Sequence, residues 1–258
     1  MWELVIIAVV SFSAAVLTFF SGFGLGTLLT PVFLLFFPVE LAIALTGVVH
    51  FFNNLFKLLL VGRRSDRKVL IRFGIPAVIF AFMGALLLFS VPTDQLLVSY
   101  SIGGHLFKIY LLKLIIALLL VFFAILDLLP YLNRLEIDPK WLPVGGALSG
   151  FFGGLSGHQG ALRSAFLIRA GMGKETFIGT AVVISTFVDF SRLGVYASSV
   201  SLLGLGQYLD VILVGTAAAI TGAFIGHRLL KKVTLAFIQN LVAVLLFLLA
   251  LALGVGLI

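Results

Sequence analysis

The stretch from Gly150 to Gly160 reads GFFGGLSGHQG and joins two short apolar segments, Leu142–Leu155 and Ala161–Ala170. A shorter run from Gly22 to Gly26 reads GFGLG and precedes a third short apolar segment, Thr27–Phe37. Glycine is among the poorest helix formers, because fixing its backbone costs the most conformational entropy. The two runs therefore predict interrupted helices at two places in the chain.

The composition around these runs is that of a membrane protein. Of the 258 residues, 62% are hydrophobic and only 10% are charged, whereas about a quarter of the residues in a typical soluble domain are charged. The absence of cysteine excludes disulfides and thiolate metal sites. The formal charge of +7 is better explained by basic loops that orient the chain in a bilayer than by nucleic acid as a partner.

Seven further apolar segments have about the 20 residues that a helix needs to cross the hydrocarbon core. They are Trp2–Phe20, Leu41–Val61, Val69–Phe89, Phe107–Leu129, Phe177–Ala197, Tyr208–Leu230 and Leu235–Leu257. Broken backbone inside a membrane is tolerated only where protein or a water-filled cavity satisfies its polar groups. We therefore expect the two glycine runs to lie inside the bundle.

Basic residues predict the direction of each segment. Four groups of them lie between segments: Arg63, Arg64, Arg67 and Lys68; Arg134 and Lys140; Arg169 and Lys174; Arg228, Lys231 and Lys232. Cytoplasmic loops carry the excess of Lys and Arg. If each short segment forms a hairpin with its neighbour, all four groups are cytoplasmic and both termini are outside.

This topology has five segments in each half, so the two halves would be inverted relative to each other. Gly26 and Gly160 then occupy matching positions, each followed by a short apolar segment and a long helix carrying Thr46 or Thr180. Inverted repeats with broken helices near the midplane are typical of secondary transporters. The predicted fold is an all-α integral membrane protein, with residues 1–130 as the first repeat and 131–258 as the second.

The two breaks are candidate binding sites for an anion. A helix that begins inside the membrane presents unpaired N–H groups and the positive end of its dipole. The candidate substrate-binding residues at the breaks are Gly24, Gly26 and Thr27 in the first, and Ser156, Gly157, His158, Gln159 and Gly160 in the second. The alternative is that these glycines only let helices pack closely.

Arg163 lies three residues after Gly160, within an apolar segment. A guanidinium at this depth is costly and usually faces a cavity or a partner, and its fork matches an oxyanion. Arg163 would contact substrate or pair with Asp189. His158 would bind substrate, carry a proton or make a hydrogen bond within the loop. We expect no metal and no cofactor, since no second ligand stands at helical spacing from His158.

Polar stripes mark the long helices after each break. On Leu41–Val61 the stripe consists of Thr46, His50, Asn53, Asn54 and Lys57; on Phe177–Ala197 it consists of Thr180, Ser185, Asp189 and Arg192. These spacings place each set on one face, which should point into the bundle. We expect His50, Asn53 and Asn54 to contact substrate or other helices. Asp189 and Arg192 should form an ion pair with a structural or coupling role. Lys57 should snorkel to the cytoplasmic surface.

These motifs resemble the sulfite exporter TauE/SafE family of anion permeases over essentially the whole chain. The resemblance rests on the run from Ser21 to Gly26 with Pro31, its counterpart at 150–160, and the Thr-bearing helix after each. It implies a secondary carrier of sulfite, a sulfonate or a related organosulfur anion. The chain departs from the first-half pattern at Ala165, which stands where Pro31 stands, and at His158-Gln159.

The leading hypothesis is a multi-pass transporter of the cell (inner or plasma) membrane that moves a small anion by alternating access. Proton coupling through His158, His50 or Asp189 stays open. Its partners would be the small anionic substrate and the lipid bilayer, and a homodimer stays open. The alternatives are a passive anion channel and, less well supported, an intramembrane enzyme. Ser156 and His158 lack an acid beside them in the sequence, which argues against a hydrolase.

Overall fold

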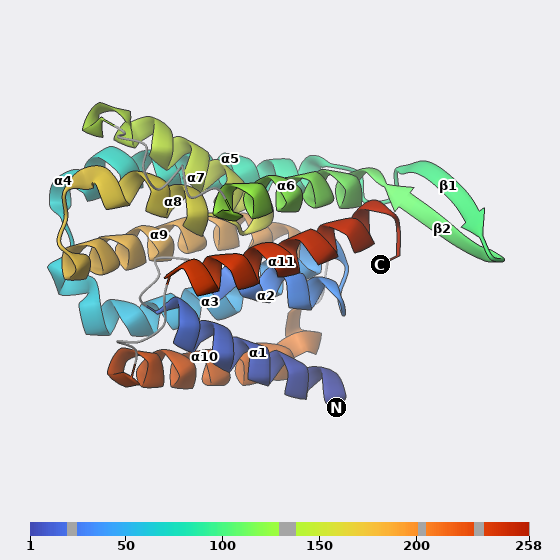
Figure 1. Cartoon of the computed structure of the whole chain (residues 1–258), viewed down its shortest axis with the longest axis horizontal. Helices are drawn as coiled ribbons and strands as arrows, with labels where there is room; N and C mark the ends of the chain where they lie inside the picture. Colours follow the sequence, from blue (N-terminus) through green and yellow to red (C-terminus); the bar gives the residue numbers. More distant parts are fainter. Residues whose placement is uncertain (20–24, 129–137, 201–204, 230–234, 258) are drawn as a thin grey trace.

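The computed structural model describes residues 1–19, 25–128, 138–200, 205–229 and 235–257. These residues form a bundle of helices whose long axes run in roughly the same direction, with a β-hairpin projecting from one end (Figure 1). The main helices are α1 (Trp2–Thr18), α2 (Leu25–Leu34), α3 (Val39–Val61), α5 (Ile75–Ser90), α6 (Leu111–Leu128), α7 (Leu142–Ser156), α8 (Gly160–Leu167), α9 (Lys174–Val200), α10 (Leu209–Leu229) and α11 (Leu235–Gly254). Every apolar segment predicted from the sequence overlaps one of them.

Short turns extend or connect these helices. They are η1 (Gly62–Arg64), α4 (Arg67–Val69), the π-helical turn η2 (Leu70–Gly74), η4 (Pro139–Trp141), η5 (Ile168–Ala170) and η6 (Leu205–Tyr208). By length and composition, four continuous helices could cross a membrane: Val39–Arg64, Arg67–Ser90, Lys174–Ser198 and Gly206–Arg228. Large apolar side chains such as Ile79, Phe82, Leu213 and Leu248 are exposed on the outside, which suits lipid rather than water.

The packing order places α3 and α9 against each other inside the bundle. Helix α5 packs on α7 and α9, α10 packs on α1 and α3, and α6 packs on α11. A stripe of glycines brings α7 close to the backbone of α5. A Cβ added at Gly150 would lie 1.9 Å from the carbonyl oxygen of Ala77, and one at Gly154 would lie 2.0 Å from that of Ala81. These glycines serve close helix packing.

The interruption at 150–160 is therefore shorter than the glycine content predicts. Helix α7 continues through Ser156, and only three residues separate it from α8. Gly157 makes the break possible, because its φ of 80° lies in the left-handed region that side chains disfavour. Most glycines of this run belong to a helix, and the break lies at residues 157–159, between the predicted short segments Leu142–Leu155 and Ala161–Ala170.

The start of the segment that was predicted to be a helix from Phe107 forms a strand instead. Strands β1 (Leu96–Ile102) and β2 (His105–Tyr110) form an antiparallel hairpin, and the helix predicted from Phe107 begins at Leu111. Gly103 and Gly104 form its turn with φ of 61° and 81°, as a tight two-residue hairpin turn requires. The Tyr100 hydroxyl donates to the carbonyl of Val255 at 2.5 Å, which ties β1 to the end of α11.

The two ends of the bundle differ in charge. Both termini and the hairpin lie at one end, whereas α4, the start of α9 and the end of α10 lie at the other (Figure 1). The segments at the second end carry most of the basic residues, among them Arg63, Arg64, Arg67, Lys68, Lys174 and Arg228. There the Arg64 guanidinium pairs with the Glu175 carboxylate, which links η1 to α9. The placement of both termini at the same end agrees with the predicted topology.

Candidate functional site

The start of α2 and the break between α7 and α8, far apart in sequence, lie against each other. A Cβ added at Gly26 would lie 3.4 Å from the carbonyl oxygen of Gly157, and one at Gly157 would lie 3.2 Å from the hydroxyl of Thr30. The first turn of α2, including the buried Thr27, thus abuts the break between α7 and α8. Gly24, also predicted to bind substrate, lies outside the described residues.

Polar side chains in and near the second break donate hydrogen bonds to nearby backbone carbonyls. The His158 Nδ1–H donates to the carbonyl of Ser156 at 2.8 Å, and the His158 ring stacks on Phe123 with centroids 5.5 Å apart. The Ser156 hydroxyl donates to the carbonyl of Phe152 at 3.0 Å. The Ser149 hydroxyl donates to the carbonyl of Gln159, also at 3.0 Å. These bonds favour a structural role for Ser156 and fix how the His158 ring is turned.

Asp189 is the centre of a buried group that we name the Asp189 cluster: Asp189, His50, Asn54, Gln159 and Arg192. Its Oδ2 accepts from His50 Nδ1 at 2.6 Å and from Asn54 Nδ2 at 2.9 Å. Its Oδ1 accepts from Arg192 Nε at 3.0 Å and from Gln159 Nε2 at 3.4 Å, and Arg192 Nη2 lies 2.8 Å away. The cluster joins α3, α9 and the start of α8 through one carboxylate.

Arg192 and Tyr196, which lie one turn apart on α9, also hold α9 to α7. Arg192 Nη1 donates to the carbonyl of Gly153 at 3.3 Å, and the Tyr196 hydroxyl donates to the carbonyl of Gly154. Arg192 and Asp189 are both fully buried. The two charges of this ion pair offset each other, and both side chains make further hydrogen bonds. A buried ion pair needs both conditions in order to be tolerated.

Arg163 enters the same region from the first turn of α8. Its Nη1 donates to Gln159 Oε1 at 3.2 Å and also to the Ser185 hydroxyl on α9. Because Gln159 in turn contacts Asp189, Arg163 is joined to the Asp189 cluster through that amide. The guanidinium is only 3% exposed.

Beside Arg163 is a small cavity of about 20 Å³, which we name the Lys57 cavity. It is lined by Thr18, Phe19, Leu25, His50, Asn54, Lys57, Arg163, Ile178, Ala181, Val182 and Ser185. Lys57 is 5% exposed, so it does not snorkel to the surface as predicted. Its Nζ lies 5.3 Å from the centroid of the Phe19 ring. The helical spacing of Lys57 from His50 and Asn54 was the signal that placed it on the inner face.

The charges in this region do not balance. Apart from the histidines, the buried charged side chains of the described segments are Lys57, Arg163, Arg192 and Asp189. Three basic side chains thus share this part of the interior with one carboxylate. Burying a charge without a counter-charge costs several kcal/mol on the general scale. An anion in the Lys57 cavity would offset that cost.

The sequence was compared with models of known protein families. A model of the sulfite exporter TauE/SafE family matches residues 7–253. The chain belongs to the sulfite exporter TauE/SafE family. It is accordingly a membrane protein of an anion-transporter family, and the resemblance seen in its glycine runs is confirmed. A search of curated proteins found no match.

Other residues predicted for the site of this TauE/SafE protein lie outside the Lys57 cavity. Asn53 is fully buried, and among the described residues its side-chain amide has no hydrogen-bond partner. Asn53, Thr27 and Gly160 are buried but do not line the cavity. Their contact with substrate stays a prediction. No group of three His, Asp or Glu side chains that could hold a metal occurs in the described segments.

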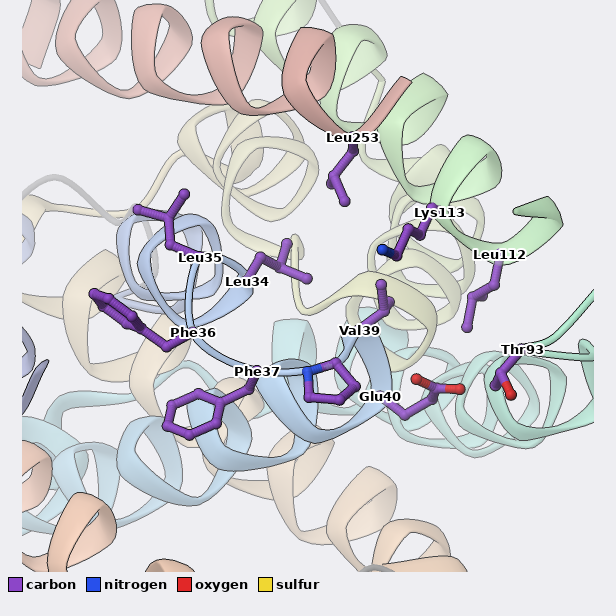
Figure 2. A pocket seen from close by; sticks show the side chains of 11 residues that line it. Leu34, Leu35, Phe36, Phe37, Val39, Glu40, Thr93, Leu112, Lys113 and Leu253 are labelled. Atoms are coloured by element: carbon purple, nitrogen blue, oxygen red, sulfur yellow. The ribbon is translucent and has the colours of Figure 1, made fainter. Parts of the chain in front are cut away.

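A larger hollow of about 400 Å³ lies at the hairpin end of the bundle (Figure 2). Most of its wall is apolar, and Figure 2 shows the amino group of Lys113 pointing into it, with Glu40 and Thr93 to one side. Helix α2 connects the two spaces, since Leu34 lines the hollow and Leu25 lines the Lys57 cavity. The cations gather at the smaller space, which makes it the better candidate for an anion site in the TauE/SafE protein.

Proposed function

We propose that this chain is a secondary active carrier of a small oxyanion, sulfite or a sulfonate, and that the anion binds at the Lys57 cavity. The observation that carries the proposal is the set of buried basic side chains in and beside this cavity, Lys57, Arg163 and Arg192, near one buried carboxylate, Asp189. Arg163 suits a sulfur oxyanion because its planar guanidinium can donate two parallel hydrogen bonds. The first turns of α2 and α8 add helix N-termini near the same place.

The helix packing supports the proposed inverted repeats, residues 1–130 and 131–258. One half can be exchanged for the other if each helix of the first half is paired with its counterpart in the second. The pairs are α1 with α7, α2 with α8, α3 with α9, α5 with α10 and α6 with α11. Under this exchange the α5–α7 contact becomes α10–α1, and α5–α9 becomes α10–α3. The α3–α9 and α6–α11 contacts map onto themselves. A pseudo-two-fold axis through the α3–α9 interface accounts for all of these contacts.

The small size of the cavity supports alternating access as the mechanism in this proposal. A space of about 20 Å³ has room for a water or two, whereas sulfite has four heavy atoms. The side chains must move apart to admit it, so this conformation is closed to substrate. From the meeting point of the breaks, α2 runs to the hairpin end and α8 toward the basic end. Rocking of one repeat against the other would open each side in turn, with the basic end cytoplasmic in the cell membrane.

The His50–Asp189 contact of 2.6 Å supports proton coupling as part of this proposal. His50 both bonds the carboxylate and lines the Lys57 cavity. An imidazole in this position could lose or gain its proton when an anion arrives or leaves. A transmembrane pH gradient should then change the extent of anion accumulation.

The test is uptake by purified protein reconstituted in liposomes, with sulfite, sulfoacetate, taurine, thiosulfate, sulfate and acetate compared with and without a pH gradient. We expect saturable uptake of one sulfur oxyanion. Arg163→Ala should reduce it by at least about 100-fold, the scale of losing one buried charged partner. Arg72→Ala is the matched control, since Arg72 is exposed on η2.

Two results would contradict the proposal. Folded, inserted protein that transports none of these anions would remove the sulfur-anion assignment. Flux that never saturates and follows the membrane potential would favour a passive channel over a carrier.

A further inference from the structure

Helix α2 has the hollow of Figure 2 at one end and the Lys57 cavity at the other. Leu34 lines the hollow and Leu25 lines the cavity, about 14 Å apart along a helix that rises 1.5 Å per residue. Helix α3 repeats this arrangement, since Glu40 lines the hollow and His50 lines the cavity. The two spaces share no lining residue, and the middle turns of α2 and α3 lie between them.

These middle turns carry three buried hydroxyls without a hydrogen-bond partner among the described residues: Thr27 and Thr30 on α2, and Thr46 on α3. Each of the three side chains is at most 3% exposed. A buried threonine can donate to its own helix, as Thr186 on α9 does to the carbonyl of Val182 at 2.9 Å. An unpaired buried hydroxyl lowers stability. Three of them between two spaces indicate groups retained for a passing ligand.

Two of the hydroxyls lie where α2 meets the break between α7 and α8. A Cβ added at Gly157 would lie 3.2 Å from the Thr30 hydroxyl oxygen. A Cβ added at Gly26 would lie 3.7 Å from the Thr46 methyl group and 3.8 Å from the ring of His50. His50 also lines the Lys57 cavity. The unpaired hydroxyls therefore reach from the α2 side of the hollow to a wall of the cavity.

The hollow itself has a charge that suits an arriving anion. Figure 2 shows the amino group of Lys113 pointing into it, and this Nζ lies 5.6 Å from the centroid of the Tyr110 ring. Among the described residues, no carboxylate lies within ion-pair distance of Lys113. Glu40 and the exposed Thr93 line the same hollow to one side. Its volume of about 400 Å³ leaves room for an anion that keeps part of its hydration.

We propose that the hollow is the outer vestibule of the transport path and that Lys113 gathers the anion there. From the vestibule the path follows Thr30 and Thr46 between α2 and α3 to the Lys57 cavity. This inference rests on the proposed function and adds the outer half of the path to it. Glu40 opposes the attraction of Lys113, which keeps the anion loosely held so that it can move on.

The first experiment uses the absence of cysteine from the chain. Thr93→Cys places a single thiol at the hollow, and Ser101→Cys places one on the exposed hairpin as a control. The reaction rates with an anionic and a cationic membrane-impermeant methanethiosulfonate reagent are compared. Adding Lys113→Met to Thr93→Cys should lower the anionic-to-cationic rate ratio at least about fivefold. In Ser101→Cys the ratio should hardly change. An unchanged ratio in Thr93→Cys overturns the role of Lys113.

The second experiment measures uptake of the transported anion from the hairpin side in proteoliposomes. Lys113→Met should raise KM at least about threefold with kcat nearly unchanged. Glu40→Gln should lower KM, because it removes the opposing charge. Lys108→Met is the matched control, since Lys108 is an exposed lysine of β2 at the same end of the bundle. Equal KM in Lys113→Met and Lys108→Met overturns the vestibule.

Thr30→Val tests the path, because valine keeps the shape of threonine and removes only the hydroxyl. Uptake should fall about tenfold, whereas resistance to a denaturing detergent should stay the same or rise, since no hydrogen bond is lost. Thr186→Val is the control: Thr186 lines neither space and loses a helix hydrogen bond, so uptake should persist. Wild-type uptake in Thr30→Val overturns the path.

Failure of the proposed function looks different from failure of this inference. A wild type that moves none of the anions removes the proposed function and the path with it. The labelling ratios require no transport, so they still decide whether Lys113 gathers anions in the hollow. A wild type that transports, with Lys113→Met and Thr30→Val unaltered, overturns the inference alone.

Discussion

The Asp189 cluster and the Lys57 cavity lie side by side in the same membrane interior, yet their charges are arranged in opposite ways. In the cluster, one carboxylate accepts from His50, Asn54, Gln159 and Arg192. In the cavity, Lys57 and Arg163 line one small space without a carboxylate. His50 and Asn54 belong to both, so the two regions share a wall.

This difference separates two uses of a buried charge. Arg192 also donates to the backbone of α7, so its cluster fastens helices together with its charge already offset. Lys57 and Arg163 instead line a small space to which, among the described residues, no carboxylate contributes. Breaking a balanced buried pair destabilises the fold, whereas an excess of one sign favours a ligand of the other sign. The comparison predicts which substitutions damage stability and which damage binding.

The largest effect on stability should come from Asp189→Ala. It leaves Arg192 buried without its counter-charge and removes the acceptor of three other side chains. Breaking a buried pair in this way costs about 3–5 kcal/mol. Unfolding in detergent, followed by loss of helical circular dichroism as a denaturing detergent is added, measures the change. Lys57→Met is the contrasting variant and should cost little stability. Equal losses in the two variants would contradict the distinction between the two regions.

Two neighbouring asparagines on α3 should behave differently. Asn54 donates to the Asp189 carboxylate, so Asn54→Leu should cost about 1.5–3 kcal/mol, as expected for a hydrogen bond to a charged group. The buried amide of Asn53 has no partner in the described part of the chain. Asn53→Leu should therefore cost nothing or raise stability by about 1 kcal/mol. The same unfolding assay compares them. A loss in Asn53→Leu as large as in Asn54→Leu would mean that Asn53 has a structural partner.

The smallest of these effects should be that of Tyr196→Phe. This change removes the hydroxyl that donates to Gly154 and keeps the buried ring in place. We expect a loss of about 1 kcal/mol in stability and unchanged sulfite uptake, because Tyr196 does not line the cavity. If uptake fell sharply while stability hardly changed, the contact between α9 and α7 would take part in transport directly.

The glycine runs show how far the sequence could be interpreted. Spacing alone placed the breaks after Gly26 and Gly160, and the structure has helices beginning at Leu25 and Gly160. Composition could not tell which glycines break a helix. Gly150 and Gly154 lie in α7 because the backbone of α5 approaches there, and only the left-handed φ of Gly157 marks the break itself. The Gly103-Gly104 pair, between two stretches of β-favouring residues, could have predicted the hairpin.

The sequence by itself determined that the chain is a membrane protein, where nearly all its helices lie and which faces of α3 and α9 are polar. These properties follow from the length of apolar segments and from helical periodicity, and both are local. Only the tertiary structure decided that Gly26 meets Gly157, that Asp189 takes Arg192 while Arg163 faces the cavity, and that Lys57 is buried beside it. Such choices depend on side chains from different helices competing for one carboxylate and one small space. The spacing of residues along the chain does not give the distance between residues on different helices.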